Sequence, residues 1–138
     1  MTLEDFTRAQ VEELNRRHGS PLRDGAEVDR FYDLVGGHPY LVRRGLHGMA
    51  AHGIPLAAIE AEAGHDEGLF GDHLRRMLAL LARDPELQEA TRGVLQGRPP
   101  RSVDSFFRLR SAGIIRGAST RDAQPRCRLY AAYLERHL

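Results

Sequence analysis

Apolar residues recur along most of the chain at spacings of three and four residues, which is typical of amphipathic α-helices. The pattern is clearest in two stretches, one with Val28, Phe31, Tyr32 and Val35 and the other with Leu74, Met77, Leu78 and Leu81. We expect the second of these helices to begin near Gly68 and to include Phe70. The periodicity therefore predicts a protein built mainly of α-helices.

Residues that favour helix ends divide the first part of the chain into short helices. Thr7 and Gln10 form a capping-box pair, with Phe6 and Val11 in the positions of a hydrophobic staple. Glycines near the end of a helical pattern and prolines near its start mark the later boundaries. The expected signals are Gly19 with Pro21 after the first helix, Asp24 before the second and Gly36-Gly37 after it, His38-Pro39 before the third and Gly53 after it, and Pro55 before a fourth helix with Leu56, Ile59 and Ala63.

The pattern changes in the last third of the chain. Asp84-Pro85 predicts the start of one helix and Ser102 the start of the next, which should bury Val103, Phe106 and Leu109 and end at Gly113. Two short strands are then expected, at 114–116 and 126–128, followed by a helix with Leu129, Tyr130, Tyr133 and Leu134. The order helix, helix, hairpin, helix is the outline of a winged helix.

Together these patterns predict a mainly α fold, in which a helical bundle is followed by a winged helix with one small β-hairpin. We expect the helical part over residues 1–84 and the winged-helix part over residues 85–138. One core should join both parts, formed by Leu14, Phe31, Val35, Leu41, Leu46, Leu74, Leu78, Leu81 and Leu87.

Composition excludes several classes of enzyme. All 20 residues in the Lys+Arg count are arginine, so the chain lacks the lysine that a P-loop or a Schiff base requires. The formal net charge of +1 gives no global field for nucleic acid. A single cysteine, Cys127, favours a reducing, cytoplasmic location, and no apolar run approaches the roughly 18 residues of a membrane span.

Four ordered segments carry a resemblance to a known family. The run from Leu34 to Arg43, LVGGHPYLVR, resembles the lid segment of the AAA-like domain in bacterial STAND-type signalling ATPases. The segments 6–11, 70–76 and 125–133 resemble the same family in the same order, so the similarity covers nearly the whole chain. In that family a helical lid and a winged helix follow the nucleotide-binding core. The chain begins about where the last strand of that core ends, so we expect either a fragment of a longer protein or a stand-alone relic.

The resemblance implies half of a nucleotide site. Gly37-His38-Pro39 is similar to the Gly-x-Pro lid motif, whose proline packs near the nucleotide base. It implies nucleotide contacts from Gly36, Gly37, His38, Pro39, Arg43 and Arg44. The phosphate loop, the acidic strand that handles Mg²⁺ and the sheet between them are missing from this sequence. ATP or ADP would therefore be bound only with a P-loop core supplied in cis or in trans, and no catalytic residue is implied.

The same four residues, 36–39, have a simpler interpretation. Two glycines ending one helix and a proline beginning the next form ordinary helix punctuation. The two interpretations are compatible, because a tight turn is how such a lid motif would be built.

Other candidate chemistry is weaker. His47 and His52 are five residues apart, which does not place two metal ligands on one helix face, and we expect no metal site. His73 should instead be half-buried and hydrogen-bonded within the helices. Cys127 lies between Arg126 and Arg128, yet in an alternating strand it would point into the core rather than act as a nucleophile.

Arginines are concentrated in the C-terminal part, on the predicted second helix and wing. Candidate contacts with DNA or a protein partner are Arg101, Arg108, Arg110, Arg116, Arg126 and Arg128. Arg75 and Arg76 are further candidates for phosphates or acidic partners. The leading hypothesis is a non-catalytic regulatory module that senses a nucleotide held by another domain and relays its state within a signalling assembly. The alternative is a small winged-helix DNA-binding regulator, which the acidic residues Asp104 and Asp122 make less favourable.

Overall fold

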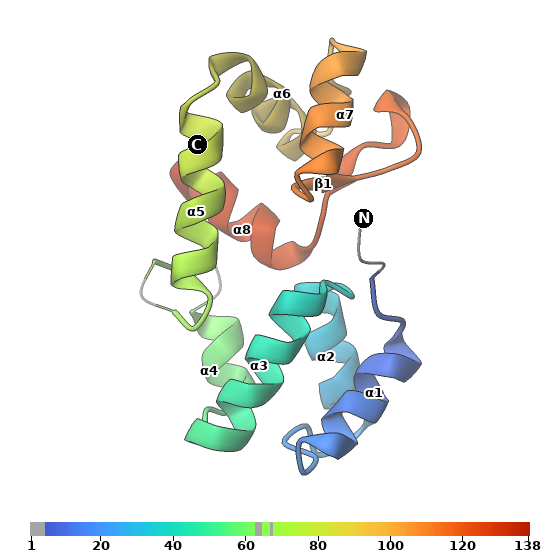
Figure 1. The fold of residues 1–138 in the computed structure, drawn as a ribbon, viewed down its shortest axis with the longest axis vertical. Coiled ribbons are helices and arrows are strands. Elements are labelled where there is room, and N and C mark those ends of the chain that lie inside the picture. Colours follow the sequence, from blue (N-terminus) through green and yellow to red (C-terminus); the bar gives the residue numbers. More distant parts are fainter. Residues whose placement is uncertain (1–4, 63–64, 67) are drawn as a thin grey trace. The chain divides into compact units, whose positions relative to one another are not determined.

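The computed structural model describes residues 5–62, 65–66 and 68–138, and it is mainly helical with one small antiparallel hairpin near the C-terminus (Figure 1). This confirms the predicted fold class. The chain divides into two compact units, with the division between Gly71 and Asp72. The predicted division into a helical part at 1–84 and a winged-helix part at 85–138 stays a prediction, as does a core common to both parts.

The first unit contains α1 (Arg8–Arg17), α2 (Gly25–Val35), α3 (Pro39–His52) and α4 (Leu56–Ala61). Helix α1 packs on α2 and α3, and α2 also packs on α4. The apolar stripes point inward and form a core that includes Val11, Leu22, Val28, Phe31, Val35, Leu41, Val42, Leu46, Leu56 and Ile59. Burial of these side chains is the main force that holds such short helices in place, because isolated helices of this length are unstable in water.

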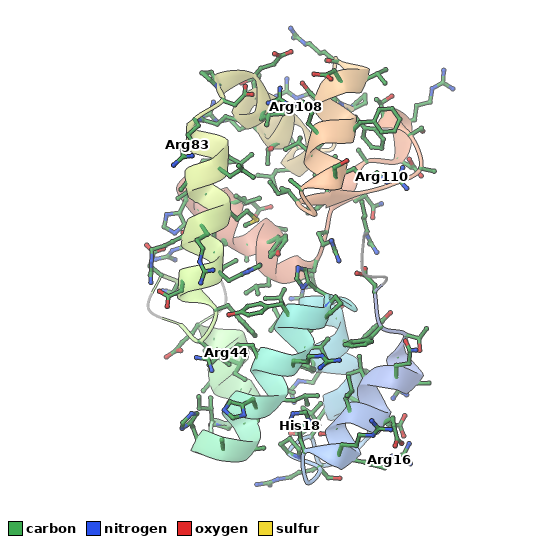
Figure 2. All side chains as sticks on the ribbon, viewed as in Figure 1. Arg16, His18, Arg44, Arg83, Arg108 and Arg110 are labelled. Carbon is green, nitrogen blue, oxygen red and sulfur yellow. The ribbon has the colours of Figure 1, made fainter. Side chains whose placement is uncertain are left out.

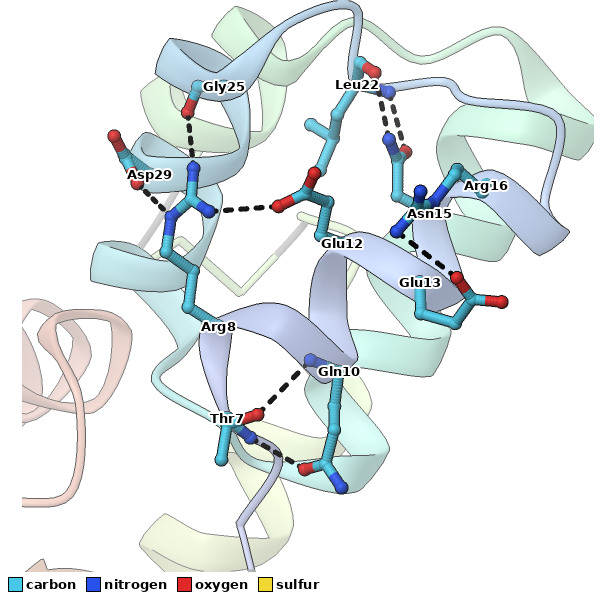
Figure 3. Close-up of polar contacts among 10 residues, drawn as sticks. All are labelled: Thr7, Arg8, Gln10, Glu12, Glu13, Asn15, Arg16, Leu22, Gly25 and Asp29. Carbon is cyan, nitrogen blue, oxygen red and sulfur yellow. Dashed lines mark hydrogen bonds and ion pairs between the residues drawn. The ribbon is translucent and has the colours of Figure 1, made fainter.

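Local capping chemistry explains where these helices begin. In the capping box before α1, the Thr7 amide donates to Gln10 Oε1 at 2.8 Å and the Gln10 amide donates to Thr7 Oγ1 at 3.2 Å (Figure 3). Asp24 caps α2 in a similar way, accepting from the Glu27 amide at 2.9 Å. Gly53 ends α3 in the left-handed conformation, with φ +65°. These predicted boundaries are confirmed, while Ala63 of the expected fourth helix lies outside the described residues.

A buried asparagine connects α1 to α2. Asn15 is 4% exposed, and its side-chain amide donates to the Leu22 carbonyl at 2.9 Å. Its Oδ1 accepts from the Leu22 amide, also at 2.9 Å (Figure 3). Both polar groups of the Leu22 backbone are therefore satisfied although Leu22 itself is buried. Arg8 adds a second connection, with bonds to Glu12, Asp29 and the Gly25 carbonyl.

Two glycines on α3 permit close packing in the first unit. A side chain at Gly45 would come within 2.6 Å of the Phe31 ring, and one at Gly48 within 2.9 Å of Leu69. Leu69 and Phe70 therefore lie against the glycine face of α3 and do not belong to the next helix. The prediction that this helix begins near Gly68 is wrong, because the chain becomes helical only at Gly71.

The second unit contains most of α5 (Gly71–Ala82), followed by α6 (Pro85–Leu95), α7 (Val103–Ser111), β1 (Ile115–Arg116), η1 (Thr120–Asp122), β2 (Gln124–Pro125) and α8 (Arg128–His137). The strands are antiparallel, with Ile115 opposite Pro125 and Arg116 opposite Gln124. Helix α6 packs on both α7 and α8. All four predicted apolar positions of α8 (Leu129, Tyr130, Tyr133 and Leu134) are buried. The predicted order of helices and hairpin is confirmed, and the winged-helix assignment stays a prediction.

The predicted returning strand at 126–128 is wrong. The second strand is Gln124–Pro125, Cys127 is the residue preceding α8, and Arg128 is already helical. The backbone at Cys127 is extended, with φ −159°, and its side chain is buried as expected. Three residues with alternating polar and apolar side chains fit a short strand as well as the start of a helix. Here the long apolar stripe of α8 stabilises the helix.

Some predicted core positions lie nearer the surface. Val103 is 60% exposed, whereas Phe106 is 1% exposed as predicted. Phe107, next to Phe106, is 51% exposed. Leu14 and Leu78 are half-buried. Helix α7 therefore packs on the face of Ser105, Phe106 and Leu109 and leaves the opposite face to solvent.

Candidate functional site

The junction between α2 and α3 contains Gly36 to Pro39, four of the six residues that the sequence singles out as nucleotide contacts. Gly36 has φ +62° and ψ −148°, a conformation that residues with a side chain rarely adopt. Its amide donates to the Tyr32 carbonyl at 2.8 Å, which completes the last turn of α2. The chain then reverses and enters α3 within three residues.

Gly37 is required for a different reason, the close approach of the N-terminal segment. A Cβ atom at Gly37 would lie 2.0 Å from the Phe6 carbonyl oxygen and 2.8 Å from the Phe6 amide nitrogen. The Phe6 amide donates to the Gly37 carbonyl at 2.8 Å. The segment before α1 is thus attached directly to the turn, and only glycine fits at this position.

His38 and Pro39 begin α3. The His38 carbonyl accepts from the Val42 amide at 2.9 Å, and its Nδ1 accepts from the Leu41 amide at a longer 3.5 Å. Pro39 occupies the first helical position, where its fixed φ suits the helix and its missing N–H is not needed. Pro39 has no N–H and the Leu41 amide donates to His38, so the feature of this helix start that favours an anion is its partial positive charge.

Two arginines follow on α3. The Arg43 guanidinium lies 5.6 Å from the centroid of the Phe6 ring, a cation–π distance. Arg44, labelled on α3 in Figure 2, is half-buried and makes no ion pair with any residue that the structure describes. Pro39 and Arg43 are four residues apart and share one side of the helix. The structure thus brings all six predicted residues together in one turn and the helix that follows it.

Tyr40 is an additional candidate that sequence reasoning missed. It is 43% exposed, one residue after Pro39 and four residues before Arg44. An exposed aromatic ring beside a helix N-terminus offers a flat apolar surface next to an anion site. The signal available in the sequence was its spacing from Arg44, which places both side chains on one side of α3.

The six C-terminal arginines are more dispersed. Arg108 donates to Asp84 Oδ2 at 2.6 Å, and this bond, with help from the Leu87 amide, lowers the pKa of the Asp84 carboxyl. Arg116 donates to Gln124 Oε1 at 3.0 Å, and Arg126 to the Gly113 carbonyl at 3.5 Å. The remaining three, Arg101, Arg110 and Arg128, have exposed side chains. Arg108, Arg116 and Arg126 therefore bond to groups within the second unit.

The exposed face of α7 is partly apolar. Val103, Phe107 and Arg110 follow one another at intervals of four and three residues, which aligns them on the solvent side of the helix. Base recognition in a major groove uses mainly polar and charged side chains. A face with an exposed valine and phenylalanine is better suited to a protein surface than to a groove of DNA.

His73 confirms one prediction in detail. Its Nε2 lies 2.6 Å from the Tyr130 hydroxyl, which joins α5 to α8 within the second unit. Burial, and to a lesser extent the charge of Arg76, lowers the pKa of His73 below its ordinary value. Arg75, by contrast, pairs with Asp72 on the same helix. These contacts give His73 a structural role.

No grouping of three metal-ligating side chains occurs among the residues with described positions. His47 and His52 meet edge to face, with ring centroids 5.8 Å apart. Among the residues that the structure describes, no helix is long and apolar enough to cross a membrane.

A family model described as an AAA-like domain matches residues 1–136. Neither the curated proteins nor the solved structures include a significant match.

Proposed function

Since the chain belongs to the AAA-like domain family, we propose that it is a non-catalytic lid module that contacts a nucleotide held mainly by a P-loop core. The core would be supplied in cis or in trans, because this sequence has no lysine for a phosphate loop. The module would differ in its contacts between nucleotide-bound and nucleotide-free states, and so report the state to other proteins of a signalling assembly. This role is the one implied by the resemblance to STAND-type ATPases.

The observation that supports the proposal is the construction of the α2–α3 turn. Gly36 and Gly37 each satisfy a separate steric demand, and Pro39 stands at the first position of α3. The turn leaves a helix N-terminus preceded by a short, tightly bonded backbone, and the partial positive charge of such a helix end favours a phosphate. Pro39 and Tyr40 would contact the base and ribose.

The charges near this turn suit the phosphates. Arg44 has a half-buried side chain that forms no ion pair with the described residues, and Arg43 is held over Phe6. Guanidinium groups bind phosphate oxygens through paired hydrogen bonds. We assign Arg44 the closer phosphate contact, since Arg43 is already engaged with an aromatic ring.

In the proposal the second unit passes the signal to protein partners. Its helices α6, α7 and α8 and the β1–β2 hairpin have the order expected of a winged helix. The apolar side of α7 favours a protein contact over a DNA contact. DNA binding is the second candidate function, supported by the exposed side chains of Arg101 and Arg110.

A nucleotide titration of the isolated chain, followed by amide chemical shifts, tests the proposal. ATP should shift amides of residues 36–44, adenosine should affect mainly Pro39's neighbours, and inorganic triphosphate should affect mainly Arg43 and Arg44. A half-site supports only weak binding, of the order of a millimolar dissociation constant. The absence of shifts in residues 36–44 at that concentration would leave the turn as helix punctuation alone.

A further inference from the structure

A pocket of about 390 Å³ lies between α6 and α7 in the second unit. It is separate from the α2–α3 turn and does not depend on the proposed nucleotide contact. Glu86, Glu89 and Gly93 line it from α6, and Arg98 and Arg101 from the loop that leads to α7. Its size is within the range of sites that hold small molecules.

The pocket has a negative end and a positive end. Helix α7 returns along α6, since Arg108 bonds to Asp84 at the start of α6. At the other end of α6, the Arg98 amide donates to the Gly93 carbonyl at 2.7 Å. Glu86 and Glu89 therefore lie toward one end, and the two pocket arginines lie at the loop end with the N-terminus of α7.

Two of the four charged side chains of the pocket already have partners within the protein. Glu89 has a long ion pair with Arg92, at 3.6 Å, and Arg98 bonds to the Gln96 side chain. In the described parts of the chain, the side chains of Glu86 and Arg101 make no hydrogen bond or ion pair. Glu86 interacts with Arg108 only through its charge. The Glu86 carboxylate and the Arg101 guanidinium therefore keep their hydrogen-bonding capacity for a ligand at opposite ends.

A buried hydroxyl gives independent evidence for a ligand. Ser105 lines the pocket and is 1% exposed, yet its Oγ has no hydrogen-bond partner among the described atoms. Its neighbour Ser102 is already used as the cap of α7, accepting from the Ser105 amide at 3.2 Å. A buried hydroxyl without a partner is unfavourable, and a ligand carboxylate at the positive end would satisfy it.

We propose that this pocket binds a short zwitterionic peptide, with its amino group at Glu86 and its carboxylate at Arg101, Ser105 and the start of α7. Glu86 and Gly93 are seven residues apart, which corresponds to roughly 10 Å along a helix. Three extended peptide residues span about the same length. A single amino acid is too short to reach both ends. Pro99 and Pro100 of the loop offer an apolar wall for the middle of the peptide.

The test is a titration of the complete 138-residue chain with trialanine, N-acetyl-trialanine and trialanine amide. Trialanine should cause saturable amide shifts at Gly93, Ser102 and Ser105. Each capped peptide should bind about tenfold more weakly, because one charge has lost its partner. Glu86→Gln should weaken the binding of trialanine but not that of N-acetyl-trialanine. Arg101→Gln should weaken the binding of trialanine but not that of trialanine amide.

Two further variants separate binding from folding. Ser105→Ala should reduce trialanine affinity several-fold without lowering the melting temperature, because the hydroxyl has no partner in the free protein. Arg110→Gln, on the exposed side of α7, is the matched control and should leave affinity unchanged. The proposal is overturned if trialanine gives no saturable shifts up to about 10 mM. It is equally overturned if the capped peptides bind as well as trialanine, or if Ser105→Ala leaves affinity unchanged, which would indicate a buried water at the hydroxyl.

Discussion

At the residue scale, Gly36 and Gly37 occupy adjacent positions for unrelated reasons. Gly36 needs a positive φ, whereas Gly37 needs the absence of a side chain beside the Phe6 backbone. A sequence shows two glycines after a helix and identifies a stop signal, which the structure confirms. It does not show the second requirement, because Phe6 is thirty-one positions earlier in the chain.

We expect Gly37→Ala to destabilise the first unit by about 1–3 kcal/mol, because the new methyl group must displace the Phe6 backbone. Gly93→Ala is the matched control, since its nearest contact would be an ordinary 3.7 Å to the Arg98 carbonyl oxygen. The control should be neutral or slightly stabilising, because alanine favours a helix. Chemical denaturation of both variants measures the difference, and equal stabilities would contradict the close approach at Gly37.

His73 should make stability depend on pH. Burial lowers its pKa in the folded protein, so the unfolded chain binds the proton more readily. Its contribution is therefore complete above the ordinary pKa of about 6.5 and declines as the pH falls below that value. His73→Gln should show a smaller loss of melting temperature than the parent between about pH 7 and pH 5. Parallel profiles for the two proteins would show that His73 is not the titrating group.

At the element scale, capping residues locate most helix starts. Asp24, Asp84 and Ser102 each accept from an amide in the first turn of the helix that they precede. These signals are local in sequence, which is why they could be identified without a structure. Two predictions, the strand at 126–128 and the start of α5, were wrong because tertiary packing decides both. Burial of the apolar stripe of α8 makes Arg128 helical. Packing of Leu69 and Phe70 against α3 delays the start of α5 to Gly71.

Asp84 combines a cap with a tertiary contact. Its Oδ1 accepts from the amides of Glu86 and Leu87, at 3.1 and 3.2 Å, while its Oδ2 accepts from Arg108. Asp84→Ala should lower the melting temperature most, because it removes both functions. Asp84→Asn and Arg108→Gln should each have a smaller effect, since they weaken the exposed ion pair and keep a cap. If Arg108→Gln were as harmful as Asp84→Ala, the cap would be unimportant.

At the scale of the whole molecule, charge bears on the choice between DNA and protein partners. Twenty arginines nearly balance nineteen acidic residues. Several arginines are paired within their own unit, as Arg8, Arg30 and Arg108 are. The chain as a whole therefore has no large net positive charge to attract nucleic acid at long range.

Duplex DNA should accordingly bind weakly, with a dissociation constant no tighter than the nonspecific range of about 10⁻⁶ to 10⁻⁴ M at physiological salt. Arg110→Gln and Arg108→Gln should change this little. Fluorescence anisotropy at several salt concentrations measures both the affinity and its salt dependence. Nanomolar binding that falls steeply with salt and is lost in these variants would support the DNA-binding alternative instead.

The candidate nucleotide site shows how far sequence alone can reach. Gly36 to Pro39 could be selected from their order and family resemblance, and the structure places them in one turn with Arg43 and Arg44 on the helix that follows. Tyr40 was overlooked because exposure cannot be inferred for one aromatic residue within an apolar helix. The buried Ser105 hydroxyl without a hydrogen-bond partner could not be predicted either, because its burial depends on how α7 packs.

The most direct measurement compares ATP binding to Pro39→Ala and Pro85→Ala by amide chemical shifts. Both prolines occupy the first position of a helix, so both substitutions should disturb folding to a similar, small extent. We predict that Pro39→Ala abolishes the ATP-dependent shifts of residues 36–44, while Pro85→Ala leaves them unchanged. Equal shifts in both variants, or none in the parent chain at millimolar ATP, would contradict the proposed nucleotide contact.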